Sequence, residues 1–253
     1  LHQLLRTVPG AGRIISNGAD ANLDAALEQG CWTPVERFGR DGKADWQAAF
    51  VDQGQKRIRI TSPAGDTAET RWTLAGSHNL ENVVAAVAAA HHAGVAVDVA
   101  VRALADFTGV KRRLERTATV ADIAIYDDFA HHPTAIERTL DGLRRHTPGR
   151  RLVVALEPRS NTMRLGHHNE TLAASLHRAD RVFLYAPEDM ASSLDIALEP
   201  LGERLTMATD YDELVQTMAS EVEPGDIVVF MSNGGFGGAR QTFTAVLKRL
   251  LSE

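Results

Sequence analysis

The sequence has little of several features that would place it in a specialised class of protein. A single cysteine, Cys31, excludes an intrachain disulfide framework and fits a reducing compartment. No stretch approaches the roughly 18 consecutive apolar residues of a membrane span, and the first residues lack a signal-peptide pattern. The net charge of −6 gives no general reason to bind nucleic acid or an anionic membrane. We therefore expect a cytoplasmic protein with neither of those partners.

What is present is typical of an ordinary globular protein with a sizeable core, in one large domain or two modest ones. Hydrophobic residues make up 44% and charged residues 24% of the 253 positions. Residues 13–73 are strand-like and broken by turns, with short strands at 13–16, 46–51 and 56–61 and a helix at 21–29. Residues 56–61 alternate apolar and polar side chains, which favours a small sheet with hairpins. Two helices follow, one rich in alanine and valine that ends near Ala93 and one at 98–107.

The second half alternates strands and helices. Strands are predicted at 123–126, 151–156, 181–185, 204–207 and 226–231, and helices at 133–146, 167–179, 192–198, 210–222 and 238–251. This alternation predicts an α/β domain with a mostly parallel sheet, whose apolar strands are buried on both faces. A short basic hinge at Gly109–Arg113 separates the halves, so we predict domains at 1–112 and 113–253.

Two groups of residues before and at the hinge can carry chemistry. In residues 76–82 (GSHNLEN), Asn79 and Asn82 share a helical face, and a side-chain amide suits the edge of an adenine. The alternative is a helix capped by Ser77 or Asn79. Lys111, Arg112 and Arg113 can clamp phosphate, or they can be ordinary solvated charge.

Further groups follow three of the predicted strands. Residues 127–134 (DDFAHHPT) place two carboxylates and two imidazoles before a helix that starts at Pro133, where ligands bind in α/β proteins. These residues can form a metal site, contact a ribose or simply start a helix. Adjacent side chains point in different directions, which disfavours convergence of all four on one ion. Residues 157–164 (EPRSNTMR) form a donor-rich pocket for an acidic ligand. Residues 231–238 (MSNGGFGG) form a glycine-rich loop that can expose backbone amides to a ligand or simply be flexible.

Together these segments resemble the Mur ligases in order and spacing. Residues 76–82 resemble the family's GxHNxxN motif, residues 109–115 its interdomain arginine motif, and residues 127–134 the opening of its C-terminal domain. The resemblance implies the distal part of a central ATPase domain, with a small sheet and helices, followed by a Rossmann-like C-terminal domain. Residues 157–164 and 231–238 look most like the murein-recycling branch. That branch joins UDP-N-acetylmuramate to the tripeptide L-alanyl-γ-D-glutamyl-meso-diaminopimelate through an acyl phosphate.

The resemblance also implies a role for individual residues, with ATP and Mg²⁺ as cofactors. Catalytic roles fall to His131, near the reacting centre, and to Arg113, on the ATP phosphates. The implied nucleotide contacts are His78, Asn79, Asn82, Arg113 and Asp128, and the implied tripeptide contacts are Arg159, Ser160, Asn161, Arg164, Ser232 and Asn233.

Two elements of the family, the phosphate loop and the uridine-nucleotide-binding domain, are missing from these 253 residues. No phosphate loop of the GxxGKT type is present, and the family's magnesium ligands belong to the same missing region, so no metal ligand is assigned here. The chain starts at Leu1 in what reads as the end of a helix, so we expect a piece of a longer ligase that is inactive alone. The alternatives are a UDP-N-acetylmuramate–L-alanine ligase, a folylpolyglutamate synthetase and a non-catalytic nucleotide- or peptide-binding module.

Overall fold

The computed structural model describes residues 2–40, 44–74, 76–159 and 169–251. The chain divides into two compact units, Leu1–Thr108 and Gly109–Glu253. The predicted domains, 1–112 and 113–253, differ from these units in the placement of residues 109–112. Within the described residues, no helix combines the length and the apolar composition needed to cross a bilayer.

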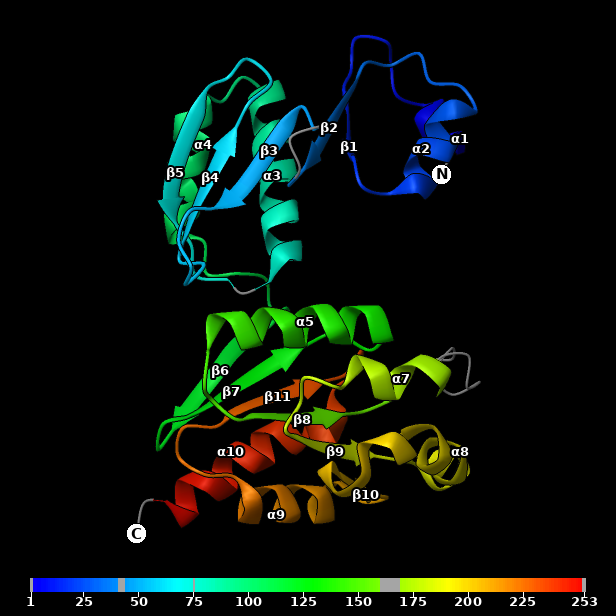
Figure 1. Cartoon of the computed structure of the whole chain (residues 1–253), viewed down its shortest axis with the longest axis vertical. Coiled ribbons are helices and arrows are strands. Elements are labelled where there is room, and N and C mark those ends of the chain that lie inside the picture. Colours follow the sequence, from blue (N-terminus) through cyan, green and yellow to red (C-terminus); the bar gives the residue numbers. More distant parts are fainter. Residues whose placement is uncertain (1, 41–43, 75, 160–168, 252–253) are drawn as a thin grey trace. The chain divides into compact units, whose positions relative to one another are not determined.

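The first unit is built on a five-stranded mixed sheet in the order β1-β2-β3-β4-β5 (Figure 1). Strands β1 to β3 are parallel, and β3, β4 and β5 form the two antiparallel hairpins that the turn pattern predicts. The elements are α1 (His2–Leu5), β1 (Ile14–Asn17), α2 (Ala21–Glu28), β2 (Val35–Gly39), β3 (Trp46–Phe50), β4 (Arg57–Thr61), β5 (Thr67–Arg71), α3 (Ser77–His92), α4 (Val97–Ala103) and the 3₁₀ turn η1 (Leu104–Asp106).

Alternation along β4 explains how this sheet is covered. Ile58 and Ile60 are fully buried and pack in one core with Leu80 and other apolar residues of α3. On the opposite face, Arg57 and Arg59 both pair with Glu69 of β5, with nitrogen–oxygen distances of 2.9 and 2.6 Å. The predicted two-residue period is therefore confirmed.

The second unit is a six-stranded sheet in the order β10-β9-β8-β11-β7-β6. All neighbours are parallel except the edge pair β6 and β7, which confirms a mostly parallel sheet. The elements are β6 (Glu115–Val120), β7 (Ile123–Asp128), α5 (Pro133–His146), β8 (Leu152–Leu156), α7 (Asn169–Ser175), β9 (Arg181–Tyr185), α8 (Glu188–Leu198), the 3₁₀ segment η2 (Glu199–Arg204), β10 (Leu205–Ala208), α9 (Tyr211–Glu221), β11 (Ile227–Met231), the 3₁₀ turn η3 (Phe236–Gly238) and α10 (Ala239–Leu250).

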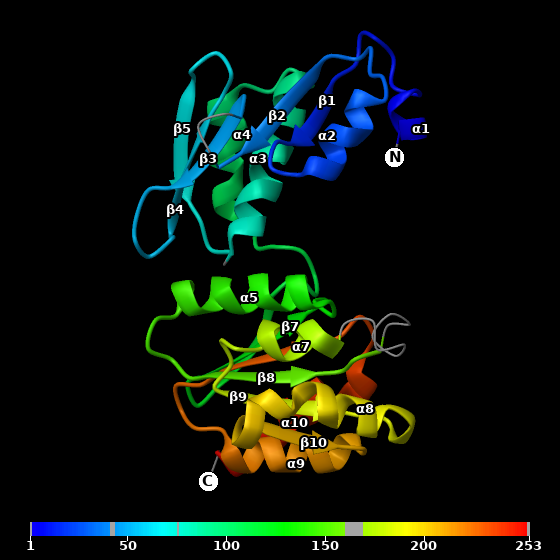
Figure 2. The same ribbon diagram turned by 45° about the vertical axis from the view of Figure 1, so that its right-hand side comes forward.

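Helices cover both faces of this sheet, with α5 and α7 on one face and α9 and α10 on the other (Figure 1, Figure 2). Every residue of β8 and of β11 is buried, as the apolar runs predict. The two strands are adjacent, yet the chain continues from β8 toward α7 and from β11 toward α10, on opposite faces. The helices that follow these two adjacent strands therefore lie on opposite faces, and open α/β sheets form a binding crevice at such a point.

Candidate functional site

Three of the predicted segments start from one edge of the second sheet. Met231 of β11 is in register with both Asp128 of β7 and Leu156 of β8, so these parallel strands end side by side. The loops that begin at Phe129, Glu157 and Ser232 consequently share the carboxyl edge. The described parts of these loops define the candidate site.

A buried carboxylate joins the loops after β8 and β11. The hydroxyl of Ser232 donates to Oε2 of Glu157, and the hydroxyl of Tyr211 donates to Oε1 at 2.6 Å. Glu157 is 4% exposed and Ser232 is 2% exposed, so the hydrogen bond between them is shielded from water, whereas the one from Tyr211 is half-buried. Burial and the neighbouring carboxylate raise the pKa of Tyr211, which keeps its phenol protonated as a donor. Sequence reasoning missed Tyr211, and no local signal marks it.

Arg159 lies across the glycine-rich loop. A Cβ atom on Gly234 would sit 2.5 Å from Nη1 of Arg159, so the lack of a side chain at Gly234 leaves the space that the guanidinium occupies. Arg159 itself is exposed, and its charge is therefore available to a carboxylate at the surface. Oδ1 of the neighbouring Asn233 is buried and has no hydrogen-bond partner among the described residues. Ser160, Asn161 and Arg164 lie outside the described residues.

The three hinge cations differ in their surroundings. Arg112 donates from Nη2 to the carbonyl oxygens of Ser232, at 2.9 Å, and of Gly234. Its Nε lies 3.7 Å from Oδ2 of Asp127. Lys111 and Arg113 are exposed. Arg112 is thus used to hold the loop after β11, whereas the cation of Arg113 faces solvent.

The two adjacent aspartates also have different partners. Oδ2 of Asp127 lies 3.5 Å from Nε of Arg240 on α10, in addition to Arg112. Asp128 is 4% exposed and accepts backbone N–H groups from Leu114, at 2.6 Å, and Ala130, at 2.7 Å. Burial raises the pKa of Asp128, although these two hydrogen bonds and Arg113 act in the opposite direction. Asp128 therefore fastens the start of β6 to the end of β7.

His131 has a defined tautomer when neutral. Its Nδ1 lies 2.8 Å from the carbonyl oxygen of Phe129, which can only accept, so Nδ1 carries the proton. Nε2 is then left as an acceptor, the form that a general base needs. His132 occupies the N-cap position of α5, and its ring lies 4.1 Å from that of His131. Helix α5 begins at Pro133, as predicted.

The remaining predicted residues lie at the start of α3, in the first unit. Gly76 holds the N-cap position with a φ of 95°, which corrects the expectation that Ser77 or Asn79 caps the helix. A Cβ atom on Gly76 would come within 2.7 Å of the His78 ring, so glycine is required there for two reasons. Asn79 is half-buried and Asn82 is exposed.

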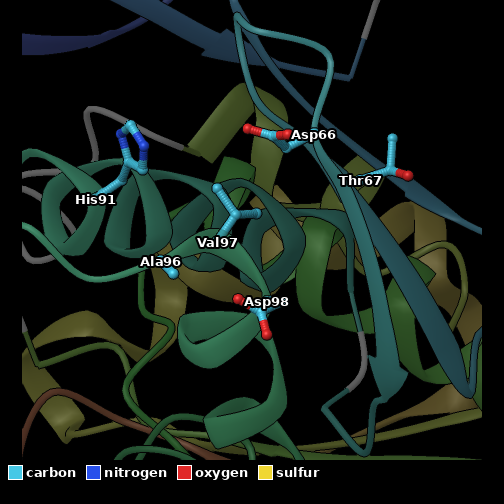
Figure 3. A pocket seen from close by; sticks show the side chains of 6 residues that line it. All are labelled: Asp66, Thr67, His91, Ala96, Val97 and Asp98. Carbon is cyan, nitrogen blue, oxygen red and sulfur yellow. The ribbon is translucent and has the colours of Figure 1, made fainter.

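Other features of the described residues offer no rival site. No group of three or more histidine, cysteine or acidic side chains in this part of the chain can hold a metal ion. The first unit has a pocket of about 380 Å³ (Figure 3), lined by Asp66, Thr67, His91, Ala96, Val97 and Asp98. Asp98 pairs with Arg102 at 2.6 Å, and the His91 ring meets Trp46 edge-on at 5.2 Å, so these groups serve the local fold.

Comparison with known families matches both units. A family model described as the Mur ligase middle domain matches residues 2–90. A second, described as the Mur ligase glutamate ligase domain, matches residues 112–234. The chain belongs to the Mur ligases. This confirms the predicted fold class of a Mur ligase central-domain segment followed by the C-terminal domain.

Individual relatives point to one branch of the family. The chain is 41% identical to the UDP-N-acetylmuramate–L-alanyl-γ-D-glutamyl-meso-2,6-diaminoheptandioate ligase of Escherichia coli K12, over 95% of this chain and 52% of that relative. It is 37% identical to the crystal structure of a murein peptide ligase from Psychrobacter arcticus, with a TM-score of 0.73, over 98% of this chain and 53% of that one. A UDP-N-acetylmuramate–L-alanine ligase from Acidothermus cellulolyticus is 30% identical, over 90% of this chain and 50% of the relative. The chain spans about half the length of the curated relatives it matches.

Proposed function

We propose that the complete protein containing this chain is an ATP-dependent amide ligase of peptidoglycan recycling. Its substrates are UDP-N-acetylmuramate and the tripeptide L-alanyl-γ-D-glutamyl-meso-diaminopimelate. The observation that carries the proposal is that Arg159 lies against Gly234, next to Ser232 and Asn233, where the adjacent strands β8 and β11 end. A guanidinium beside hydroxyl and amide groups suits a peptide rich in carboxylates. The similarity to tripeptide ligases along nearly the whole chain supports the same assignment.

We assign nucleotide-binding roles to residues within each unit. Arg113 is an exposed arginine of the hinge and meets the ATP phosphates, while His78, Asn79 and Asn82 serve adenine from the start of α3. By its motif position Asp128 is assigned to the ribose, although in this structure it is 4% exposed and each of its oxygens accepts a backbone N–H group. The described residues offer no cluster for Mg²⁺, so no metal ligand is proposed within them.

Membership of the family implies the chemistry that we propose. A carboxylate of the UDP-sugar takes the γ-phosphoryl group of ATP, which releases ADP and forms an acyl phosphate. The free amine of the tripeptide attacks this acyl phosphate, and the tetrahedral intermediate expels inorganic phosphate as the amide bond forms. Positioning and charge stabilisation dominate such phosphoryl transfers, which suits a site of arginines and backbone donors. We assign His131 to the reacting centre by its motif position, where its Nε2 acceptor can receive a proton from the attacking amine. Since both nucleotide substrates are cytoplasmic metabolites, we place the protein in the cytoplasm.

An acceptor panel separates this function from its main rival, the alanine-adding ligase. The complete protein is supplied with ATP, Mg²⁺ and UDP-N-acetylmuramate, together with the tripeptide, with L-alanine or with no acceptor. Phosphate release and the ligated product are measured in each case. We expect product only with the tripeptide. Product with L-alanine alone would favour the rival, and no product with either acceptor would favour a non-catalytic binding module.

A further inference from the structure

Tyr211 links segments that are far apart in the sequence, and the proposed function gives it no role. It is the first residue of α9, and its hydroxyl donates to Oε1 of Glu157 at 2.6 Å. Its ring stacks on Tyr185, with centroids 3.9 Å apart and an interplanar angle of 16°. The same ring meets Phe236 edge-on at 6.0 Å. Tyr211 therefore contacts the loop after β8 through its hydroxyl and the loop after β11 through its ring.

The loop after β11 has a backbone that needs outside support. Three successive residues, Phe236, Gly237 and Gly238, have positive φ angles of 50°, 55° and 80°. For Phe236 this left-handed conformation is strained, and such strain persists only where surrounding contacts fix it. Phe236 is 3% exposed. A Cβ atom on Gly237 would sit 2.4 Å from the Tyr211 ring, so the ring packs directly on the loop backbone.

Glu157 supplies the second support for this loop. Its Oε2 accepts the Ser232 hydroxyl, and the oxygen of that hydroxyl accepts the backbone N–H of Gly234 at 2.8 Å. One buried carboxylate is thus shared between Tyr211 and the first residues of the loop. Arg159, two residues after Glu157, lies on Gly234.

We propose that Tyr211 and Glu157 are positioning residues that hold residues 232–238 in the conformation that binds the acceptor substrate. Neither needs to touch that substrate, because both act through Ser232, Gly234 and the Gly237 backbone. The identity of the acceptor rests on the proposed function, whereas the support of the loop does not.

The test compares Tyr211→Phe with Tyr126→Phe in the complete protein. The first variant keeps the ring and its stacking but removes the hydroxyl from Glu157. The control removes a hydroxyl on β7, outside this network. For Tyr211→Phe we expect amide hydrogen exchange in residues 232–238 to accelerate about tenfold. The KM for the tripeptide should rise about five- to tenfold while the KM for ATP is unchanged. The control should match the wild type in all three measurements.

A second variant, Glu157→Gln, checks rescue by a conservative change. Glutamine can accept from Ser232 through its oxygen and donate to Tyr211 through its nitrogen, so exchange in residues 232–238 should stay within about threefold of the wild type. Exchange in Tyr211→Phe equal to that of the wild type would overturn the proposal. An unaltered ratio of the two KM values would overturn the link to acceptor binding. A further outcome is that the wild type fails to ligate the tripeptide while exchange in Tyr211→Phe is still faster than in the wild type. That result would support the dependence of the loop on Tyr211 and would refute only the proposed function.

Discussion

Two adjacent arginines at the hinge have different surroundings, and substitution should separate them. Arg112 donates to the carbonyl oxygens of Ser232 and Gly234, whereas Arg113 is exposed over the ring of Phe129. We expect Arg112→Ala to lower the free energy of unfolding by about 1.5–3 kcal/mol, the value of hydrogen bonds to a charged group. Arg113→Ala should cost less than about 1 kcal/mol and should instead lower kcat/KM for ATP.

Urea denaturation of both variants, with ATP-dependent ligation measured in parallel, checks this contrast. Equal losses of stability in the two variants would contradict the inward role of Arg112. Unchanged ATP kinetics in Arg113→Ala would remove the phosphate assignment.

Asp128 should make the stability of the second unit depend on pH. Burial raises its native pKa above the ordinary value of 3.8. The folded chain therefore holds the proton more tightly than the unfolded chain. The resulting stabilisation is fully present below pH 3.8 and is lost as the pH rises through the native pKa. Asp128→Asn cannot titrate, and its amide sets an N–H group against a backbone donor.

The measurement is the free energy of unfolding of the wild type minus that of Asp128→Asn, from about pH 4 to pH 7. We expect this difference to fall as the pH rises. The pKa of Asp226 is also raised by burial, but that residue is common to both proteins and cancels in the difference. A difference that rises with pH would refute the expected direction.

The glycine-rich loop offers a matched pair of neighbouring substitutions. A Cβ atom at Gly234 would displace the mobile end of Arg159, while nothing lies within 4 Å of one at Gly235. Neither glycine has a positive φ, so alanine strains neither backbone. We expect Gly234→Ala to raise the KM for the tripeptide about tenfold with little loss of stability, since one charged contact is misplaced. Gly235→Ala is the control, and a rise in its KM equal to that of Gly234→Ala would show that the effect is not due to Arg159.

Strands and helices differ in how well the sequence reveals them. The buried strands β8, β9 and β11 are continuous apolar runs, and helix α5 carries its own start signal at Pro133, so the sequence predicts each of them well. Strand β6 (Glu115–Val120) is an edge strand with mostly polar residues, so no apolar run in the sequence indicates it. Strand β2 is likewise missed, because it pairs with parallel neighbours rather than through a hairpin.

The candidate site shows the same division between local and long-range information. Motif spacing places Asp128, Arg159 and Ser232 at strand ends, and the register of β7, β8 and β11 brings those ends together. Packing alone decides that Arg112 turns inward and that Tyr211 reaches Glu157 across 54 positions of sequence. Such contacts between distant parts of the sequence form only in the complete fold, so no local sequence pattern predicts them.

For the chain as a whole, the absent phosphate loop leads to a prediction about activity. No lysine of a GxxGKT loop is available within residues 1–253 to neutralise the β- and γ-phosphates, and the described residues hold no metal cluster. We expect the isolated 253-residue polypeptide to release no phosphate from ATP in response to the tripeptide, whereas the complete protein does. Both are assayed side by side, with Arg113→Ala in the polypeptide as the background. Tripeptide-dependent release by the polypeptide that Arg113→Ala abolishes would mean that these two units alone assemble a working phosphoryl-transfer site.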